Sequence, residues 1–315
     1  MVEDDFDGGR PDPDYDVIVV GGGPAGLSAA LQLGRSLRSV LLCDSDEPRN
    51  GPASRAHGYL TRDGISPTKF RRLAREEVTA YESVDYRAAA VSSATDDSDR
   101  FRSTLETGET YSSRKLVLAT GVTDVLPDID GFERFWGSSV HRCPYCHGYE
   151  LRGRPLGVHV DSAEKIEIAK LVYNLSDDLV VFTDGSDAFD DETRDAFVGQ
   201  GVQFEDEPIA ALDGSEGVLE RVALEDGREI NRRALYYFPG VTQHTALVEQ
   251  FGLSLDSRNL VETDANGRTS IDGLFVAGDA SDRYGWSLSL AAAEGSEIGA
   301  VINAELSAEP FASDE

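Results

Sequence analysis

The chain has 315 residues, which is long enough for two domains that each bury a core. Asp and Glu number 58 against 29 Lys and Arg, so the net charge is −29, and a surface of that sign disfavours nucleic acid and anionic lipid as partners. No run approaches about 18 uninterrupted apolar residues, so we expect no membrane-spanning helix.

The first predicted unit is a strand, a glycine loop, a helix and a second strand. Residues 16–20 form a short apolar strand, an Ala- and Leu-rich helix follows to about Arg35, and a strand over residues 39–43 ends at Asp44. Glycines in the loop let the backbone approach a pyrophosphate at the helix N-terminus, and Asp44 can accept hydrogen bonds from ribose hydroxyls. The pattern predicts dinucleotide binding, although such glycines can also form a plain turn. The loop is Gly21-Gly22-Gly23-Pro24-Ala25-Gly26.

The next elements complete the first part of this domain. A helix begins at Ser66-Pro67, with Ser as N-cap and Pro at the first helical position. Residues 84–119 alternate like a small antiparallel meander. A connection that contains Pro and Gly, residues 121–127, then leads into a second α/β region.

The second region has its own strand–helix–strand pattern. Strands are predicted over 156–160 and 179–182, with a helix over about 163–175 between them. The chain then returns to a strand that closes at Gly278-Asp279 and a final helix from about Ser289. We therefore predict an α/β fold with two Rossmann-like, three-layer (ββα) domains, the second inserted into the first. Residues 14–122 and 243–308 form the first domain, 123–242 the inserted domain, and 1–13 and 309–315 acidic tails.

Two distant segments favour FAD over NAD as the dinucleotide. One is Ala119-Thr120-Gly121, at the end of the meander, and the other is Gly278-Asp279. An Asp at the end of that strand can hydrogen-bond to a ribityl chain. We predict that FAD is the cofactor.

Cys143 and Cys146 are the strongest chemical signal in the sequence. If Pro144 starts a helical turn, the two thiols face each other, and the helix N-terminus lowers the pKa of a thiol there. His147 adjoins the second cysteine and His141 precedes the first, so a histidine can take the thiol proton and return it. The pair predicts dithiol–disulfide chemistry in which a flavin exchanges two electrons with the cysteines.

Three other interpretations of the pair stay open. A zinc site needs four ligands, and although two cysteines and two histidines are present, the adjacent Cys146 and His147 suit one ion poorly. A glutaredoxin shares the Cys-Pro-Tyr-Cys letters but carries them in its opening βα unit, and two inert structural thiols are the third possibility. Cys43, at a strand end, is expected to be a small buried residue.

Together these motifs resemble the low-molecular-weight thioredoxin reductase family over residues 14–306. The resemblance implies a homodimer that holds FAD, with Cys146 against the flavin and Cys143 attacking the partner disulfide. From its place next to Cys146, we predict His147 as the acid and base of the reaction.

Two further stretches resemble a branch of that family that includes flavin-dependent dithiol oxidases. They are Asn50 with residues 57–64, and the run from Cys143 to Glu150. Where the reductases carry Arg-Gln-Val, this chain has Trp286-Ser287-Leu288, and Trp286 is either a ring stacked near the flavin or a buried interface aromatic. The resemblance extends the predicted cofactor-binding set to Asn50, His57, Ser287 and Leu288.

The inserted domain departs from the reductase pattern where NADPH should bind. Its first strand is followed by Asp161-Ser162-Ala163-Glu164, without glycine, so Cβ atoms crowd a pyrophosphate and two carboxylates repel it. The basic cluster expected after the next strand is replaced by Thr183-Asp184-Gly185. The sequence therefore argues against NADPH, while an NADPH-dependent thioredoxin reductase with a diverged pocket remains the family default.

The direction of the reaction stays open. In one hypothesis the protein reduces a thioredoxin-like protein with electrons from a donor such as reduced ferredoxin. In another it oxidises a small dithiol and passes the electrons to oxygen. A non-enzymatic hypothesis is a flavoprotein redox sensor.

The composition also suggests where the protein works. Three cysteines are too few for a disulfide framework, and the acidic N-terminus has no apolar signal region, so we expect a cytoplasmic protein with a redox-active disulfide. Only four of the basic residues are Lys. An acidic, Lys-poor surface is what solubility in concentrated salt requires, so we expect a halophilic source.

Overall fold

The computed structural model describes residues 13–97, 99–283 and 286–311, and in it the chain forms two compact units. The first consists of the chain up to Glu47, Arg71–Val122 and the chain from Gln243 onward, and the second of Pro48–Phe70 and Thr123–Thr242. The sequence division had placed residues 48–70 with the first domain. The predicted tails lie outside the described residues over 1–12 and 312–315, whereas Glu309–Phe311 forms a 3₁₀ turn, η3.

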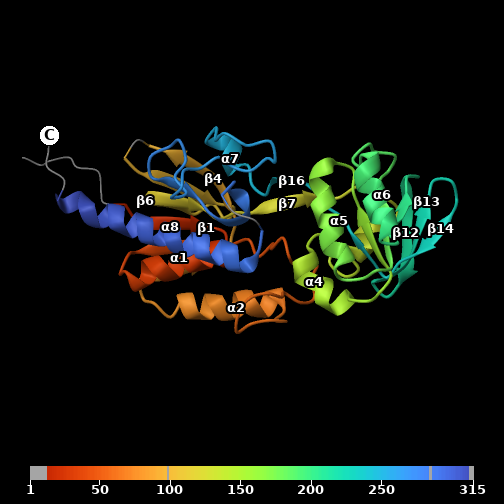
Figure 1. Cartoon of the computed structure of the whole chain (residues 1–315). Helices are drawn as coiled ribbons and strands as arrows, with labels where there is room; N and C mark the ends of the chain where they lie inside the picture. The colour runs from red at the N-terminus through yellow and green to blue at the C-terminus, as the bar shows by residue number, and fades with distance from the viewer. Residues whose placement is uncertain (1–12, 98, 284–285, 312–315) are drawn as a thin grey trace, which may run out of the picture. The chain divides into compact units, whose positions relative to one another are not determined.

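A seven-stranded sheet forms the centre of the first unit, in the order β3-β2-β1-β6-β5-β4, and β17 pairs with β6 (Figure 1). Strands β3, β2, β1 and β6 run parallel to one another, and β17 runs parallel to β6. Beyond β6, β5 pairs antiparallel with β6, and β4 pairs antiparallel with β5. The bounds are β1 Tyr15–Val20, β2 Val40–Cys43, β3 Val84–Arg87, β4 Val91–Asp96, β5 Phe101–Leu105, β6 Thr110–Leu118 and β17 Leu274–Val276.

One strand of this sheet differs from the sequence prediction. Residues 84–87 were expected to open an antiparallel meander, but β3 pairs in parallel with β2. Only β4, β5 and β6 form the meander. Alternation of apolar residues identifies a half-buried strand but does not fix which neighbour it pairs with.

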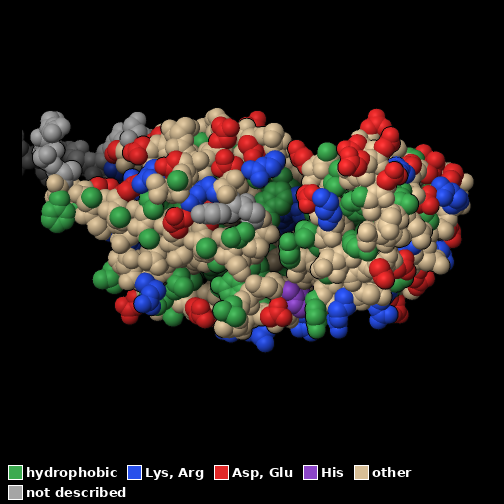
Figure 2. Space-filling model, in the orientation of Figure 1, with side chains coloured by type: hydrophobic (Ala, Val, Ile, Leu, Met, Phe, Trp, Pro, Cys, Tyr) green, Lys and Arg blue, Asp and Glu red, His purple; other side chains and the backbone are tan. Residues whose placement is uncertain are grey.

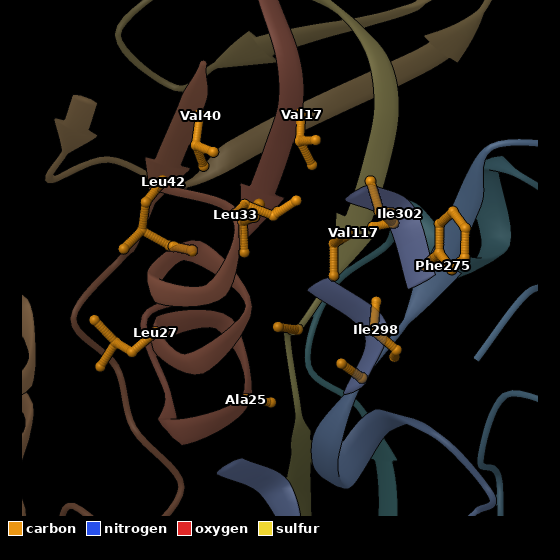
Figure 3. Close-up of a cluster of buried hydrophobic side chains, with 14 of the residues drawn as sticks. Val17, Ala25, Leu27, Leu33, Val40, Leu42, Val117, Phe275, Ile298 and Ile302 are labelled. Carbon is orange, nitrogen blue, oxygen red and sulfur yellow. The ribbon is translucent and has the colours of Figure 1, made fainter. Parts of the chain in front are cut away.

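Helices α1 (Pro24–Arg35) and α8 (Leu288–Ala308) lie side by side on one face of the first sheet (Figure 1). Because side chains alternate along β1, Val17 contributes to the cluster under these helices and Ile18 to the cluster on the opposite face. Figure 3 shows the first of these clusters between the strands and the two helices. The remaining helical elements of the unit are most of α2 (Pro67–Val78), which belongs to this unit from Arg71 onward, α7 Leu247–Gln250 and the 3₁₀ turn η2 Gly278–Ala280.

A glycine allows α8 to approach α1 closely. A Cβ on Gly295 would lie 1.9 Å from the carbonyl oxygen of Ala25, which is far inside van der Waals contact. The helix that ends the first unit is thereby packed against the first turn of the helix that begins it.

The second unit contains a five-stranded parallel sheet and a three-stranded antiparallel sheet. The parallel sheet has the order β11-β10-β9-β15-β8, and the smaller sheet has the order β12-β13-β14. Apolar clusters lie on both faces of the parallel sheet, one shared with the smaller sheet and one with the helices. The strands are β8 Val140–His141, β9 Leu156–His159, β10 Leu179–Phe182, β11 Gln203–Glu205, β12 Ile209–Ser215, β13 Val218–Leu224, β14 Glu229–Asn231 and β15 Ala234–Tyr236.

The helices of the second unit are short. The helix predicted over 163–175 begins as a 3₁₀ turn, η1 (Ala163–Lys165), and continues as α5 (Ile166–Tyr173). The others are α3 Phe132–Phe135, α4 Pro144–Leu151 and α6 Asp191–Gly199, and the strands β7 Val122–Val125 and β16 Gly240–Gln243 pair where the chain passes between the units.

The surface agrees with the composition. Figure 2 shows acidic side chains spread over the visible face of the molecule. Among the described residues, no helix combines the length and apolar character needed to cross a membrane.

Candidate active site

The two cysteines of the central motif occupy the first turn of α4. Cys143 is the N-cap residue and Pro144 the first helical residue, so the condition set in the sequence analysis, a helical turn that starts at Pro144, is met. The backbone N–H of Cys146 donates to the carbonyl oxygen of Cys143 at 3.2 Å. Both are free thiols and both are half-buried. The turn therefore presents two neighbouring sulfurs at a helix N-terminus.

The two thiols differ in acidity. A hydrogen bond from the Cys146 thiol lowers the pKa of Cys143 to about 7, against an ordinary value of 9.0, although burial works in the opposite direction. The backbone N–H groups of Cys146 and Tyr145 and the charge of Arg142 lower it further. The same contact with Cys143, together with burial, raises the pKa of Cys146. Cys143 is therefore the thiol that ionises first.

His147 is poised as a neutral base next to this pair. Burial lowers its pKa, and the neighbouring His57 lowers it further. One ring nitrogen bonds to the backbone of Arg55, whereas Nε2 is buried without a hydrogen-bond partner among the described residues. The Arg55 carbonyl can only accept, so it takes the Nδ1 proton and leaves a lone pair on Nε2. This nitrogen can accept a thiol proton.

His57 lies beside His147 in the second unit. The two ring centroids are 6.0 Å apart, edge to face. His57 Nδ1 is 3.3 Å from Asp63 Oδ1, and its Nε2 is 3.8 Å from Glu150 Oε1. The sequence pattern had suggested only a cofactor-binding role for His57 and missed this neighbourhood, because nothing local shows that the 48–70 loop packs on α4.

Two more residues lie near the dithiol: His141, which the sequence offered beside His147 as a proton acceptor, and Tyr236, which was not predicted. His141 stacks on His147 with ring centroids 4.3 Å apart, and its burial and the charge of His147 lower its pKa to about 3. Tyr236, from β15, is fully buried, and its ring centroid lies 6.1 Å from that of His141. Tyr236 sits in an apolar run, Ala-Leu-Tyr-Tyr-Phe, where the only available signal was a polar hydroxyl within an otherwise apolar strand.

The glycine loop of the first unit brings several predicted residues together. Gly21 has a left-handed φ of +110°, and a Cβ there would lie 2.3 Å from the carbonyl oxygen of Ala119. A Cβ on Gly22 would lie 2.3 Å from Asp44 Oδ2. The loop therefore contacts both Asp44 and the segment Ala119-Thr120-Gly121. Apart from its two chain neighbours, no described residue has an atom within 4 Å of the Cβ position of Gly23, which is the N-cap of α1.

Two buried polar atoms fit a dinucleotide at this loop. Asp44 Oδ2 is buried without a hydrogen-bond donor among the described residues, and Arg75 Nη2 is 3.9 Å away. Thr120 Oγ1 is also buried without a partner there. An unsatisfied carboxylate oxygen beside a glycine loop suits a ribose hydroxyl, and the open space at Gly23 suits a pyrophosphate.

The Gly278-Asp279 turn joins the same site through Ala25. A Cβ on Gly278 would lie 2.9 Å from Ala25 Cβ. Glu294, which the sequence reasoning missed, is 1% exposed and accepts from Gly278 N at 2.8 Å and from Ser281 Oγ at 2.6 Å. Burial raises its pKa. Glu294 thus holds the turn that carries Asp279.

The remaining predicted cofactor residues lie in different places. Ser287 is the N-cap of α8 and accepts from Leu290 N at 3.1 Å, Leu288 is the first residue of that helix, and Trp286 is half-buried before it. Asn50 belongs to the second unit, where its carbonyl accepts from Ala53 N.

In the second unit, carboxylates occupy the strand ends where a Rossmann-like domain binds a nucleotide. His159 Nε2 donates to Asp184 Oδ2 at 2.7 Å, and the His159 ring stacks on Tyr237 with centroids 4.4 Å apart. Asp161 follows β9 and pairs with Lys165 at 2.7 Å. No glycine lies between β9 and α5, and the helix begins as a 3₁₀ turn, so the phosphate-binding geometry of the first unit is not repeated here.

Two other expectations concern metals and Cys43. Within the described part of the chain, no group of three or more His, Cys, Asp or Glu side chains is placed to hold a metal ion. Cys43 is buried, and that burial raises its pKa to about 12, which suits an inert thiol.

The chain is similar to known proteins along nearly its whole length. A family model described as pyridine nucleotide-disulphide oxidoreductase matches residues 15–295. The thioredoxin reductase sirT of Leptosphaeria maculans is 34% identical over 307 residues, which cover 90% of this chain and 93% of that protein.

Two solved structures, each at least 32% identical, also match closely. A Bacillus anthracis protein assigned as the thioredoxin reductase TrxB has a TM-score of 0.89 at 32% identity and covers 94% of this chain and 100% of its own. An oxidoreductase from Agrobacterium tumefaciens has a TM-score of 0.87 at 33% identity, with coverages of 95% and 99%.

Proposed function

Because the chain belongs to the pyridine nucleotide-disulphide oxidoreductase family and has the thioredoxin reductase fold, we propose that it is an FAD-dependent thiol–disulfide oxidoreductase that NADPH does not reduce. Cys143 and Cys146 are its redox pair and His147 its acid and base. The observation that carries this proposal is the acidic Cys143 thiol at the start of α4, beside a neutral histidine with a free lone pair.

The thiol chemistry follows from the difference in acidity. The Cys143 thiolate attacks a partner disulfide, so that one partner sulfur leaves and a mixed disulfide forms. His147 holds the thiol proton and returns it to the leaving thiolate. Cys146 then attacks Cys143, which releases the second partner thiol and leaves the Cys143–Cys146 disulfide. The partner gains two electrons and the pair loses two.

FAD is proposed for the first unit, where it would exchange two electrons with the pair. Gly21–Gly26, Asp44 and Ala119–Gly121 would hold its dinucleotide part, and Gly278-Asp279 its ribityl chain. The orphaned Asp44 oxygen and the open space at Gly23 support this assignment.

The second unit supports independence from NADPH. Asp161 and Asp184 put negative charge where a pyrophosphate and a 2′-phosphate need donors. We therefore propose another electron partner: oxygen if the enzyme oxidises dithiols, or a reduced protein such as ferredoxin if it reduces a thioredoxin-like protein. A homodimer is proposed as the working form.

Anaerobic mixing of the purified flavoprotein with dithiothreitol, NADPH and NADH tests the proposal. Dithiothreitol is expected to bleach the flavin absorbance, whereas neither nicotinamide does so at a catalytic rate. Cys146→Ser should abolish thiol-driven bleaching, and Cys43→Ala, which removes the inert buried thiol, should not. Rapid bleaching by NADPH overturns independence from it, and unchanged bleaching in Cys146→Ser overturns the role of the pair.

The direction of the reaction is tested with the same preparation. Oxygen uptake on addition of dithiols supports the oxidase, whereas electron transfer from reduced ferredoxin to thioredoxin supports the reductase. Flavin reduction without either turnover would support a redox sensor.

A further inference from the structure

Tyr236 carries a buried hydroxyl on β15, the strand that pairs with β8 just before the dithiol helix α4. The residue has no exposed surface, and its Oη has no hydrogen-bond partner among the described residues. A phenol buried in this way loses its hydrogen bonds to water without replacement, which costs free energy, so its retention calls for a functional explanation.

The sheet fixes Tyr236 beside the motif. Tyr236 lies opposite His141 in the parallel pairing of β15 with β8, and Tyr237 N donates to the His141 carbonyl at 3.0 Å. The Tyr236 ring is 6.1 Å from the His141 ring, which in turn stacks on His147. Because the strand alternates, Tyr236 faces the cluster that includes Leu151 of α4, and Tyr237 faces the other side of the sheet.

The Tyr236 hydroxyl keeps its proton. Burial raises the pKa of Tyr236, and the charges of Cys143, Cys146 and Glu150 raise it further. The hydroxyl is therefore a donor throughout the pH range in which the Cys143 thiol ionises, and the charge of a thiolate at this pair reaches it.

The residues around the dithiol also include a matching acceptor, on the His147 ring that stacks on His141. His147 Nε2 is buried and unpartnered among the described residues, with its lone pair available. While both cysteines are protonated, one donor and one acceptor near the pair are thus unused. Removal of a proton from Cys143 would use both, since the proton needs a base, and the sulfur charge can take a further donor beside the Cys146 thiol and the N–H groups of the turn.

We propose that the Tyr236 hydroxyl is the buried hydrogen-bond donor to the thiolate formed at the Cys143–Cys146 pair, acting opposite His147. In this step the S–H bond of Cys143 breaks, an N–H bond forms at His147 Nε2, and the Tyr236 O–H donates to the charged sulfur. No electrons move. The inference rests on the proposed dithiol chemistry and adds a residue to it.

Alkylation of the reduced holoprotein with iodoacetamide over a range of pH tests this role without turnover. The rate for the wild type should rise with a midpoint near pH 7. Tyr236→Phe removes only the hydroxyl, so the rate on the acid side of the midpoint should fall by about tenfold, the usual effect of one hydrogen bond to a charged group. The control is Tyr237→Phe, the same change at the next residue on the opposite face, which should leave the midpoint unchanged.

The charged and titratable groups around the pair stay the same in both variants. These are Arg142, His57, His141, His147 and Glu150. An unchanged midpoint in Tyr236→Phe, or an equal shift in Tyr237→Phe, overturns the proposal.

A second variant keeps the test valid if Tyr236→Phe folds poorly. Fluorotyrosine introduced at position 236 makes the hydroxyl a stronger donor without removing it, so the midpoint should move to lower pH. A midpoint that stays in place or rises overturns the proposal. If Cys146→Ser abolishes thiol-driven flavin reduction while both Tyr236 variants keep the wild-type midpoint, the proposed function stands and the role of Tyr236 is rejected.

Discussion

At the scale of single residues, Cys143 derives its acidity from contacts within one helical turn. The Cys146 thiol donates to it, and the N–H groups of that turn face its sulfur. These partners are adjacent in sequence, so the spacing of the motif and Pro144 were enough to predict them.

Cys146→Ala is expected to make Cys143 less acidic, because it removes the hydrogen bond that contributes most to the low pKa. The midpoint of Cys143 alkylation should rise from about 7 towards the ordinary value of 9.0, by about 1–2 pH units for a hydrogen bond to a charged group. Cys146→Ser retains a donor and should give a smaller rise. A midpoint near 7 in the Ala variant would show that the Cys146 hydrogen bond does not set the acidity.

The polar residues around the pair could not be predicted in the same way. His57 and Tyr236 reach α4 from segments about 90 residues away on either side of it. Their roles depend on burial and on ring orientation, which arise only when β8 pairs with β15 and the 48–70 loop packs in the second unit. His147 was predicted because it adjoins Cys146.

At the scale of elements, the glycine loop combines two different requirements. Gly26 is needed by the protein itself, since a Cβ there would lie 1.9 Å from the Gly21 carbonyl oxygen. Gly23 has free space around its Cβ position and a φ of −75°, which any residue adopts. Only a bound ligand would require glycine there.

Substitution of these two glycines by Ala therefore has different expected outcomes. Gly23→Ala should leave the melting temperature of the flavin-free protein unchanged and weaken FAD binding by about tenfold or more, because the methyl group would meet the pyrophosphate. Gly26→Ala should lower the melting temperature of the flavin-free protein as well. Thermal unfolding with and without FAD, together with a fluorescence titration, measures both effects. Full FAD affinity in Gly23→Ala would place the pyrophosphate elsewhere.

The sequence predicted most elements because their signals are local. Short apolar runs marked β1, β2, β9 and β10 to within a residue or two, and Ser66-Pro67 marked the start of α2. The partner of β3 was predicted wrongly, since alternation does not distinguish a parallel from an antiparallel neighbour.

At the scale of the whole molecule, the return of cofactor-like sequence at Gly278-Asp279 indicated that one domain interrupts another. In the structure the chain forms two units and passes between them near Val122 and Gln243. No comparable signal assigned Pro48–Phe70 to the second unit. A polar loop of that kind contains no periodic pattern that identifies the surface it packs on.

The net charge of −29 predicts that salt stabilises the protein. Repulsion among carboxylates is screened over about 10 Å at 0.1 M salt and about 3 Å at 1 M. We expect the melting temperature to rise by about 5 °C or more between 0.1 and 2 M KCl, which corresponds to roughly 1–3 kcal/mol. Sucrose at equal osmolality, which does not screen charge, is the control. A flat or falling melting temperature would contradict both screening and the predicted halophilic source.

The contact of α8 with α1 has a consequence for how the chain is made. The ribosome synthesises α8 about 250 residues after α1. At about 5–20 residues per second, the face of α1 that α8 buries stays uncovered by α8 for roughly 10–50 s after α1 is made. The second unit is complete at Thr242, before α8 exists. The nascent protein thus carries one finished unit and one open one, and the unfinished glycine-loop unit is the part that a chaperone would have to shield until the last helix emerges.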